Sequence, residues 1–331
     1  MSVTTEGSAA STAETAIDPT LPICDPHHHL WVHRGRYLAG DFLADCATGH
    51  NIVSTVFVAC EAMYRESGPA ELRPVGETEF VVGEATSAAA AHSKTALAAG
   101  IVGFADLGLG ARVAEVLDAH LAASPDRFRG IRFPLAWDPS PEVRGHHSRE
   151  GWTKDANFRA AYAALGARNL SFDAWVFHPQ LPELAELADS FSNVTMILNH
   201  AGGPLGHGPY QGKSDEVFAV WSAGMRMLAE RPNVYVKLGG FGMPRIGFPW
   251  SKQAVKPTSL EIAEGIRRTV NFCIEQFGPQ RCMFESNFPS DKTSFSYVNI
   301  WNAFKRLTAS HTQSERATLF HDTAVKAYQL G

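Results

Sequence analysis

The chain has 331 residues, of which 45% are hydrophobic, so it can bury a large core, and its formal net charge is −5. It has no basic run, which excludes nucleic acid as an expected partner, and no apolar run of about 18 residues, which excludes a membrane helix. Five scattered cysteines without CxxC spacing indicate reduced thiols in a cytoplasmic protein.

The amino-terminal segment differs in composition from the remainder of the chain. Residues 1–20 are rich in Ser, Thr and Ala, and they lack the basic start and the apolar core of a secretory signal. We therefore expect residues 1–20 to form a disordered, mobile tail and residues 21–331 to form a single domain.

Eight short β-rich runs then alternate with helical stretches along the chain. The runs cover residues 23–25, 52–60, 100–105, 128–133, 172–177, 194–198, 234–238 and 281–284. Apolar residues recur at helical spacing between them, over residues 113–121, 158–165 and 181–191. Alternating strands and helices form parallel sheets, and no GxGxxG follows the first strand. The pattern therefore predicts a (β/α)8 TIM barrel rather than an open nucleotide-binding sheet.

Polar side chains gather at the carboxyl ends of these runs, where TIM barrels carry their active sites. The runs end in, or carry, the following residues: His27, His28 and His29; Glu61; Arg132; His178; Asn199 and His200; Glu285, Ser286 and Asn287. This placement predicts an active site at one end of the barrel.

The histidine triplet is the first of these sets. Side chains alternate across a strand, so His27 and His29 are expected to point into the barrel and His28 toward the outer helices. Asp25 shares the inward phase and could orient the pair by hydrogen bonding. Together with His178, the pair could bind a divalent metal ion, and neutral imidazoles suit Zn²⁺ best.

Several motifs also have the order and spacing of a known family. They are His27-His28-His29-Leu30-Trp31, Arg36-Tyr37-Leu38, Phe177-His178-Pro179, Leu198-Asn199-His200-Ala201-Gly202-Gly203, Val234-Tyr235-Val236-Lys237-Leu238-Gly239-Gly240 and Cys282-Met283-Phe284-Glu285-Ser286-Asn287-Phe288-Pro289. With these motifs the chain resembles the amidohydrolase superfamily, specifically the TIM-barrel lactonases and decarboxylases of amidohydrolase family 2.

The resemblance implies roles for four histidines. His27 and His29 would take the metal-ligand role of the first strand. His178 would be either a further ligand or an acid–base group, and His200 would contact the substrate or a second metal.

One position departs from the family pattern. The last strand usually ends in an aspartate that binds the metal and takes a proton from the attacking water, but this chain has Asn287, whose amide does not titrate near neutral pH. Three readings stay open. Asn287 holds water or substrate while a histidine acts as base; Glu285 supplies the carboxylate; or the site holds metal weakly or not at all. Asp291, in the following loop, is a fourth candidate.

Other residues are expected around the substrate. Arg132 could clamp a substrate carboxylate by two parallel hydrogen bonds, or it could form an ion pair with Glu61 or Asp25 in the barrel mouth. Glu61 could carry a proton or be half of that pair. Lys237 is expected to point outward between helices.

Aromatic side chains complete the expected substrate wall. Trp31 and Tyr64 would form a rim that suits an aromatic or cyclic substrate, and Tyr210 lies in a long loop of the kind that forms lids.

These features, taken with the resemblance, favour a hydrolase that opens a cyclic ester, a lactone bearing a carboxylate, with or without a metal. A metal ion or Arg132 would polarise the carbonyl, and His178 or His200 would activate the water. A non-oxidative decarboxylase of an aromatic acid and a non-catalytic barrel that binds a small ligand remain as alternatives. Because barrels of this kind often pair, a homodimer is a candidate assembly.

Overall fold

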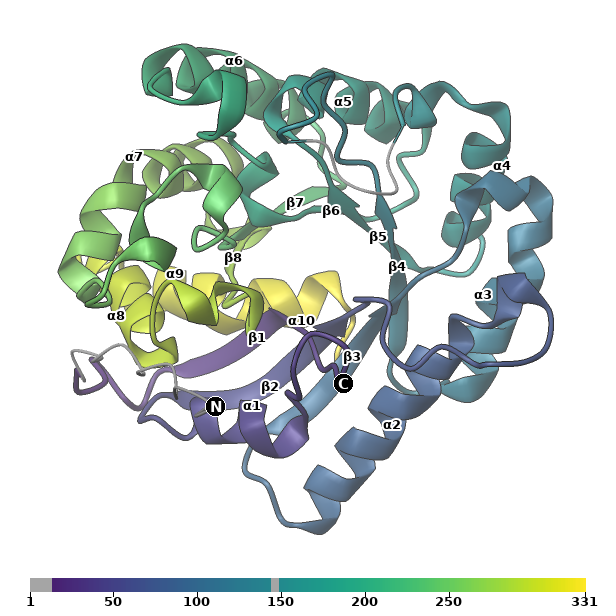
Figure 1. The fold of residues 1–331 in the computed structure, drawn as a ribbon, viewed down its shortest axis with the longest axis horizontal. Helices are drawn as coiled ribbons and strands as arrows, with labels where there is room; N and C mark the ends of the chain where they lie inside the picture. Colours follow the sequence, from purple (N-terminus) through teal and green to yellow (C-terminus); the bar gives the residue numbers. More distant parts are fainter. Residues whose placement is uncertain (1–13, 144–148) are drawn as a thin grey trace, which may run out of the picture.

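The computed structural model describes residues 14–143 and 149–331. Eight parallel strands form one sheet in the order β1 to β8, with helices on its outer side (Figure 1). The strands are β1 (Pro22–His28), β2 (Asn51–Val58), β3 (Ala96–Gly103), β4 (Phe128–Pro134), β5 (Ser171–Trp175), β6 (Met196–Leu198), β7 (Val234–Leu238) and β8 (Cys282–Phe284). The predicted TIM barrel and its eight strands are confirmed.

The two ends of the sheet meet just beyond β8. The backbone N–H of His29 donates to the carbonyl of Phe288 at 2.8 Å, and that of Asn287 donates to the carbonyl of His27 at 3.0 Å. The first and last strands therefore place their functional residues side by side.

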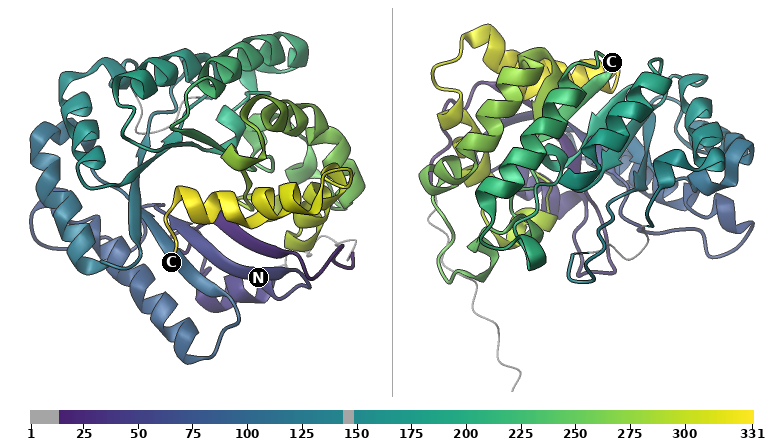
Figure 2. Two further views of the ribbon diagram at one scale, coloured as in Figure 1. Left: turned by 180° about the vertical axis from the view of Figure 1, so that it is seen from behind. Right: turned by 90° about the horizontal axis from the view of Figure 1, so that it is seen from above.

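Ten α-helices cover the outside of the sheet and close one end of the barrel in the part of the chain that is described (Figure 2). They are α1 (Ala39–Cys46), α2 (Val75–Ala90), α3 (Val113–Ala123), α4 (Ala156–Gly166), α5 (Leu181–Ser190), α6 (Ser214–Ala229), α7 (Ser259–Phe277), α8 (Tyr297–Leu307), α9 (Gln313–Ala317) and α10 (Thr323–Ala327). None of the helices described is long and apolar enough to cross a membrane.

Alternation along the strands divides the buried side chains into two groups. The larger group packs between the strands and the outer helices. The smaller group fills the barrel interior, and it includes Val56, Val102, Ile197 and Met283 together with Tyr328 from the carboxyl-terminal segment. The carboxyl-terminal segment thus contributes a side chain to the core inside the barrel.

Two expectations about strand phase were wrong. The register of β1 against β2 shifts between Asp25 and His28, so Asp25 does not share the phase of His27. Its carboxylate instead accepts hydrogen bonds from the Tyr297 hydroxyl at 2.9 Å and the Ser286 backbone N–H at 3.0 Å. Lys237 points into the barrel, where it is fully buried, and not outward between helices.

The amino-terminal segment expected as a tail falls into two parts. Residues 1–13 lie outside the described residues. The following residues contact α8: Asn302 accepts from the Ile17 backbone N–H at 2.8 Å, and the Lys305 ammonium donates to the Asp18 carbonyl at 2.7 Å. The expected tail is therefore too long at its carboxyl end.

Candidate active site

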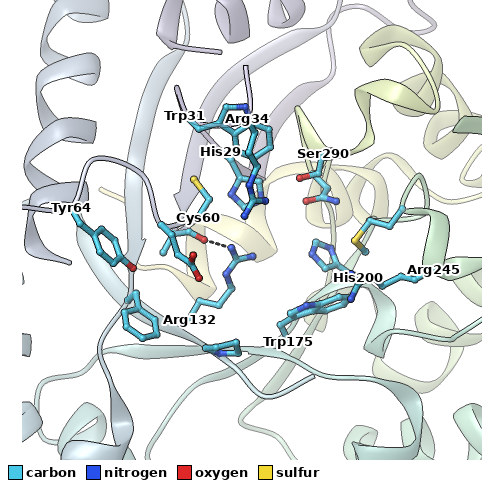
Figure 3. Close-up of a pocket in the computed structure, with 16 residues that line it drawn as sticks. His29, Trp31, Arg34, Cys60, Tyr64, Arg132, Trp175, His200, Arg245 and Ser290 are labelled. Atoms are coloured by element: carbon cyan, nitrogen blue, oxygen red, sulfur yellow. Dashed lines mark hydrogen bonds between the residues drawn. The ribbon is translucent and has the colours of Figure 1, made fainter. Parts of the chain in front are cut away.

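A cavity of about 210 Å³ opens at the carboxyl ends of the strands (Figure 3). Strand ends form its floor and the following loops form its walls. Its lining includes His29, Trp31, Arg34, Cys60, Glu61, Tyr64, Phe104, Arg132, Trp175, His200, Met243, Arg245, Asn287 and Ser290. Seven of the residues expected at the site therefore meet at one cavity: His29, Trp31, Glu61, Tyr64, Arg132, His200 and Asn287.

Glu285 links two histidines at the floor of this cavity. Its Oε1 lies 2.6 Å from His200 Nδ1 and 3.2 Å from the His200 backbone nitrogen, and its Oε2 lies 2.7 Å from His27 Nδ1. His27 and Glu285 are fully buried and His200 is 3% exposed. We call His27, His200 and Glu285 the floor cluster; it joins β1 with the ends of β6 and β8.

The floor cluster has the donors of a metal site. One ligand atom from each of its three residues lies within 4.8 Å of the others. Burial lowers the pKa of His27 far below its usual range and also lowers that of His200, so both imidazoles are neutral and carry a lone pair. Glu285 Oε2 is buried and makes no hydrogen bond, although it lies 2.7 Å from His27 Nδ1. Two imidazoles and an unsatisfied carboxylate oxygen fit a divalent ion.

The other two histidines expected as ligands are not part of this group, although the His29 ring meets the His27 ring edge-on at 5.0 Å. His29 lines the cavity, and its Nδ1 donates to the Val58 carbonyl at 2.7 Å, which leaves the lone pair on Nε2. His178 packs against Tyr210 with ring centroids 5.1 Å apart, and its Nδ1 accepts from the Leu205 backbone N–H at 3.4 Å. The roles of His29 and His178 as metal ligands stay predictions.

Asn287 is held in one orientation at the cavity wall. Its amide donates to Asp291 Oδ1 at 2.8 Å, and Asp291 Oδ2 accepts from the Gly242 backbone N–H at 2.9 Å. Burial raises the pKa of Asp291 to about 8. Asp291 therefore anchors Asn287 from behind, which favours the reading in which Asn287 hydrogen-bonds water or substrate.

Strained backbone accompanies these side chains. His200, Asn287 and Glu61 have φ angles of 54°, 56° and 66°, in the left-handed region that non-glycine residues rarely adopt. Each such residue costs on the order of 1–3 kcal/mol and persists where the surroundings hold it, which is common at functional sites. A Cβ on Gly240 would collide with the His200 ring, so this glycine makes room for the histidine.

Arg132 reaches across the barrel mouth toward the floor cluster. Its Nη1 lies 3.3 Å from His27 Nε2, its Nη2 donates to the Ala59 carbonyl, and burial lowers its pKa. The expected ion pair with Asp25 is wrong, because Asp25 faces Tyr297. Glu61, the other expected partner, lines the same cavity.

Sequence reasoning missed two cavity arginines and a tryptophan. Arg34 lies over the Trp31 ring at 5.5 Å, and Arg245 lies 5.5 Å from the Phe177 ring. Both follow strand ends in irregular loops, so no periodic pattern pointed to them. Trp175 meets His200 edge-on at 4.6 Å, and strand alternation could have placed it on the inner face of β5.

The two tyrosines expected at the substrate wall line different cavities. Tyr64 lines the active-site cavity, and its hydroxyl is buried without a hydrogen-bond partner. Tyr210 donates to Asp138 at 2.7 Å and lines a neighbouring, more apolar cavity of about 310 Å³. Tyr210, expected at the substrate wall, therefore does not line the active-site cavity.

Similar proteins identify the family. The family model described as Amidohydrolase matches residues 24–330. The uncharacterized protein y4mH of Sinorhizobium fredii is 32% identical over 333 residues, which cover 94% of this chain and 99% of that protein. The L-fucono-1,5-lactonase of Burkholderia multivorans is 27% identical over 318 residues, which cover 92% of this chain and 95% of that protein.

Solved structures share the fold. An amidohydrolase from Burkholderia multivorans with bound HEPES has a TM-score of 0.72 and 24% identity, with 93% of this chain and 99% of that chain covered. The same amidohydrolase with bound zinc has a TM-score of 0.66 at the same identity and coverage. The family match over nearly the whole chain, with a relative above 30% identity, shows that this chain belongs to the amidohydrolase family and is a hydrolase.

Proposed function

We propose that this protein hydrolyses a lactone that carries a carboxylate. The observation that carries the proposal is the hydrogen bond between Glu285 and His200 at the floor of a cavity lined by three arginines. The L-fucono-1,5-lactonase names of related proteins support the reaction class.

His200 is the proposed base. Its Nδ1–H donates to Glu285, which fixes the tautomer and leaves the Nε2 lone pair to take a proton from water. Glu285 then stabilises the imidazolium that forms, as the carboxylate does in other carboxylate–histidine pairs. This assignment gives the chain a base although Asn287 stands where the family aspartate is expected.

Arg132 is the proposed electrophilic group. The Ala59 carbonyl and the neighbouring His27 hold its guanidinium at the cavity floor. From there it can stabilise negative charge as it develops on the ring carbonyl oxygen after water attacks. The C–O bond of the ring then breaks, and the proton taken by His200 passes to the leaving oxygen.

The cavity wall favours an anionic substrate. Arg34, Arg132 and Arg245 line it, against Glu61 and the buried Glu285 below. An arginine binds a carboxylate through two parallel hydrogen bonds, so Arg245 and Arg34 are the proposed anchors for the substrate carboxylate.

A metal ion is proposed as an optional part of this site. His27, His200 and Glu285 would hold it, and Zn²⁺ is the proposed ion because two imidazoles and a carboxylate suit it. When bound, such an ion would polarise the carbonyl and lower the pKa of a water molecule. His200 would then be a ligand, so its role as base belongs to the metal-free site.

A lactone panel tests the proposal directly. Purified protein, before and after chelation, is assayed for ring opening of neutral and carboxylated five- and six-membered lactones. We expect turnover that is fastest with a carboxylated ring. The absence of hydrolysis across the panel, together with CO₂ release from hydroxybenzoates, would replace the proposal with the decarboxylase alternative.

A further inference from the structure

A buried ion pair lies inside the barrel beside the floor cluster. Lys237 of β7 and Asp173 of β5 are both fully buried, and Lys237 Nζ lies 2.7 Å from Asp173 Oδ2. Asp173 also accepts from the Tyr328 hydroxyl at 2.8 Å and from the Asn199 amide at 2.8 Å. Three buried side chains therefore donate to the Asp173 carboxylate.

The ammonium group of Lys237 faces the floor cluster as well as Asp173. Its Nζ lies 3.4 Å from His27 Nδ1, the same atom that lies 2.7 Å from Glu285 Oε2. A positive charge thus lies next to His27, one of the three residues that would hold a metal ion. In a buried site such charges act strongly, because little water screens them.

Two cations and two anions lie at the floor cluster or directly beside it. Lys237 and Arg132 are the cations, and Asp173 and Glu285 are the anions. A buried cation repels a divalent ion at a neighbouring site, because little water screens the two charges. Here an added ion would meet Lys237 and Arg132, which both lie within 3.4 Å of a His27 ring nitrogen.

We propose that Lys237 sets the metal affinity of the floor cluster, keeping it low, and that Asp173 moderates this effect. Lys237 is thus a positioning residue whose charge governs how readily a divalent ion joins His27, His200 and Glu285. The inference rests on the metal group put forward with the proposed function, but it concerns ion binding and not the lactone.

Zinc titration of charge variants tests this inference. Zn²⁺ alone is titrated against a chromogenic chelator for the wild type, Lys237→Met, Asp173→Asn and the double variant, with folding checked by circular dichroism. We expect Lys237→Met to bind zinc at least about tenfold more tightly, Asp173→Asn to bind it at least about tenfold more weakly, and the double variant to return close to the wild type.

The opposite sign at Lys237 would overturn the inference. If the pair only supports the fold, removing either partner disturbs the cluster and both single variants bind zinc more weakly. Lys237→Gln, which loses the charge but can still donate to Asp173, should also bind more tightly and serves if Lys237→Met does not fold. The wild type gives an independent check: retention of zinc against a chelator of nanomolar affinity would contradict a low-affinity site. Because none of these readouts uses a lactone, failure of the proposed function would not alter them.

Discussion

The floor and the wall of the cavity are built differently. The floor cluster comes from strands and strand ends, and its three side chains are at most 3% exposed. The wall arginines Arg34 and Arg245 come from loops, and the guanidinium group of each makes a cation–π contact with an aromatic ring. Rigid strands can hold reacting groups within narrow limits, whereas loops vary without disturbing the barrel. The floor therefore determines the reaction, and the wall determines which substrate is accepted.

The largest expected effect comes from the floor. Glu285→Gln removes the charged acceptor that orients His200, so kcat for lactone hydrolysis should fall on the order of 10³-fold or more, as when the carboxylate of a carboxylate–histidine pair is removed. Steady-state kinetics with a lactone substrate measure this change in kcat. Glu264→Gln, an exposed position on α7, is the matched control and should leave kcat unchanged. A near-normal kcat for Glu285→Gln would show that the floor cluster supports the fold and not the reaction.

A wall substitution should act on the substrate and spare the reaction. Arg245→Met removes a proposed carboxylate anchor, so KM for a carboxylated lactone should rise about 10- to 100-fold, as expected for a lost charge-assisted hydrogen bond. Kinetics with a neutral lactone should change little. Arg226→Met, on the exposed face of α6, serves as control. Equal losses for charged and neutral substrates would remove the distinction between wall and floor.

The pH dependence should report the buried base. Burial lowers the pKa of His200 from its ordinary value of 6.5, and a general base works only when unprotonated. The acidic limb of the rate profile should therefore be centred below pH 6.5. A profile of kcat/KM against pH measures this. An acidic limb centred at or above pH 6.5 would point to a more exposed base.

The smallest effect is expected at a wall residue without a polar partner. The Tyr64 hydroxyl is buried and makes no hydrogen bond, so Tyr64→Phe removes no interaction. KM and the unfolding midpoint in urea should both change by less than a factor of about two. A large rise in KM would show that this hydroxyl contacts the substrate and belongs with the arginines.

The sequence allowed the barrel and most of the floor to be predicted, because both follow from strand periodicity. Eight apolar runs and the polar residues after them placed His27, His200 and Glu285 at one mouth. Prediction went wrong where periodicity breaks. The register shift in β1 turned Asp25 away from the barrel interior. Lys237, which was expected to point outward between helices, points into the barrel.

The wall could be predicted only in part. Trp31, Glu61 and Tyr64 lie close to strand ends and line the cavity, and their roles in substrate binding stay predictions. The cavity positions of Arg34 and Arg245 depend on how irregular loops fold back over the barrel, and no pattern in the sequence encodes that path. Long-range packing of the loops decided which side chains reached the cavity.

A double-mutant cycle on the floor tests the central claim most directly. The account predicts that His200→Gln, Glu285→Gln and the double variant lose similar amounts of kcat, because the two residues act as one unit. Losses that multiply in the double variant would show that Glu285 and His200 act independently, and would contradict the account.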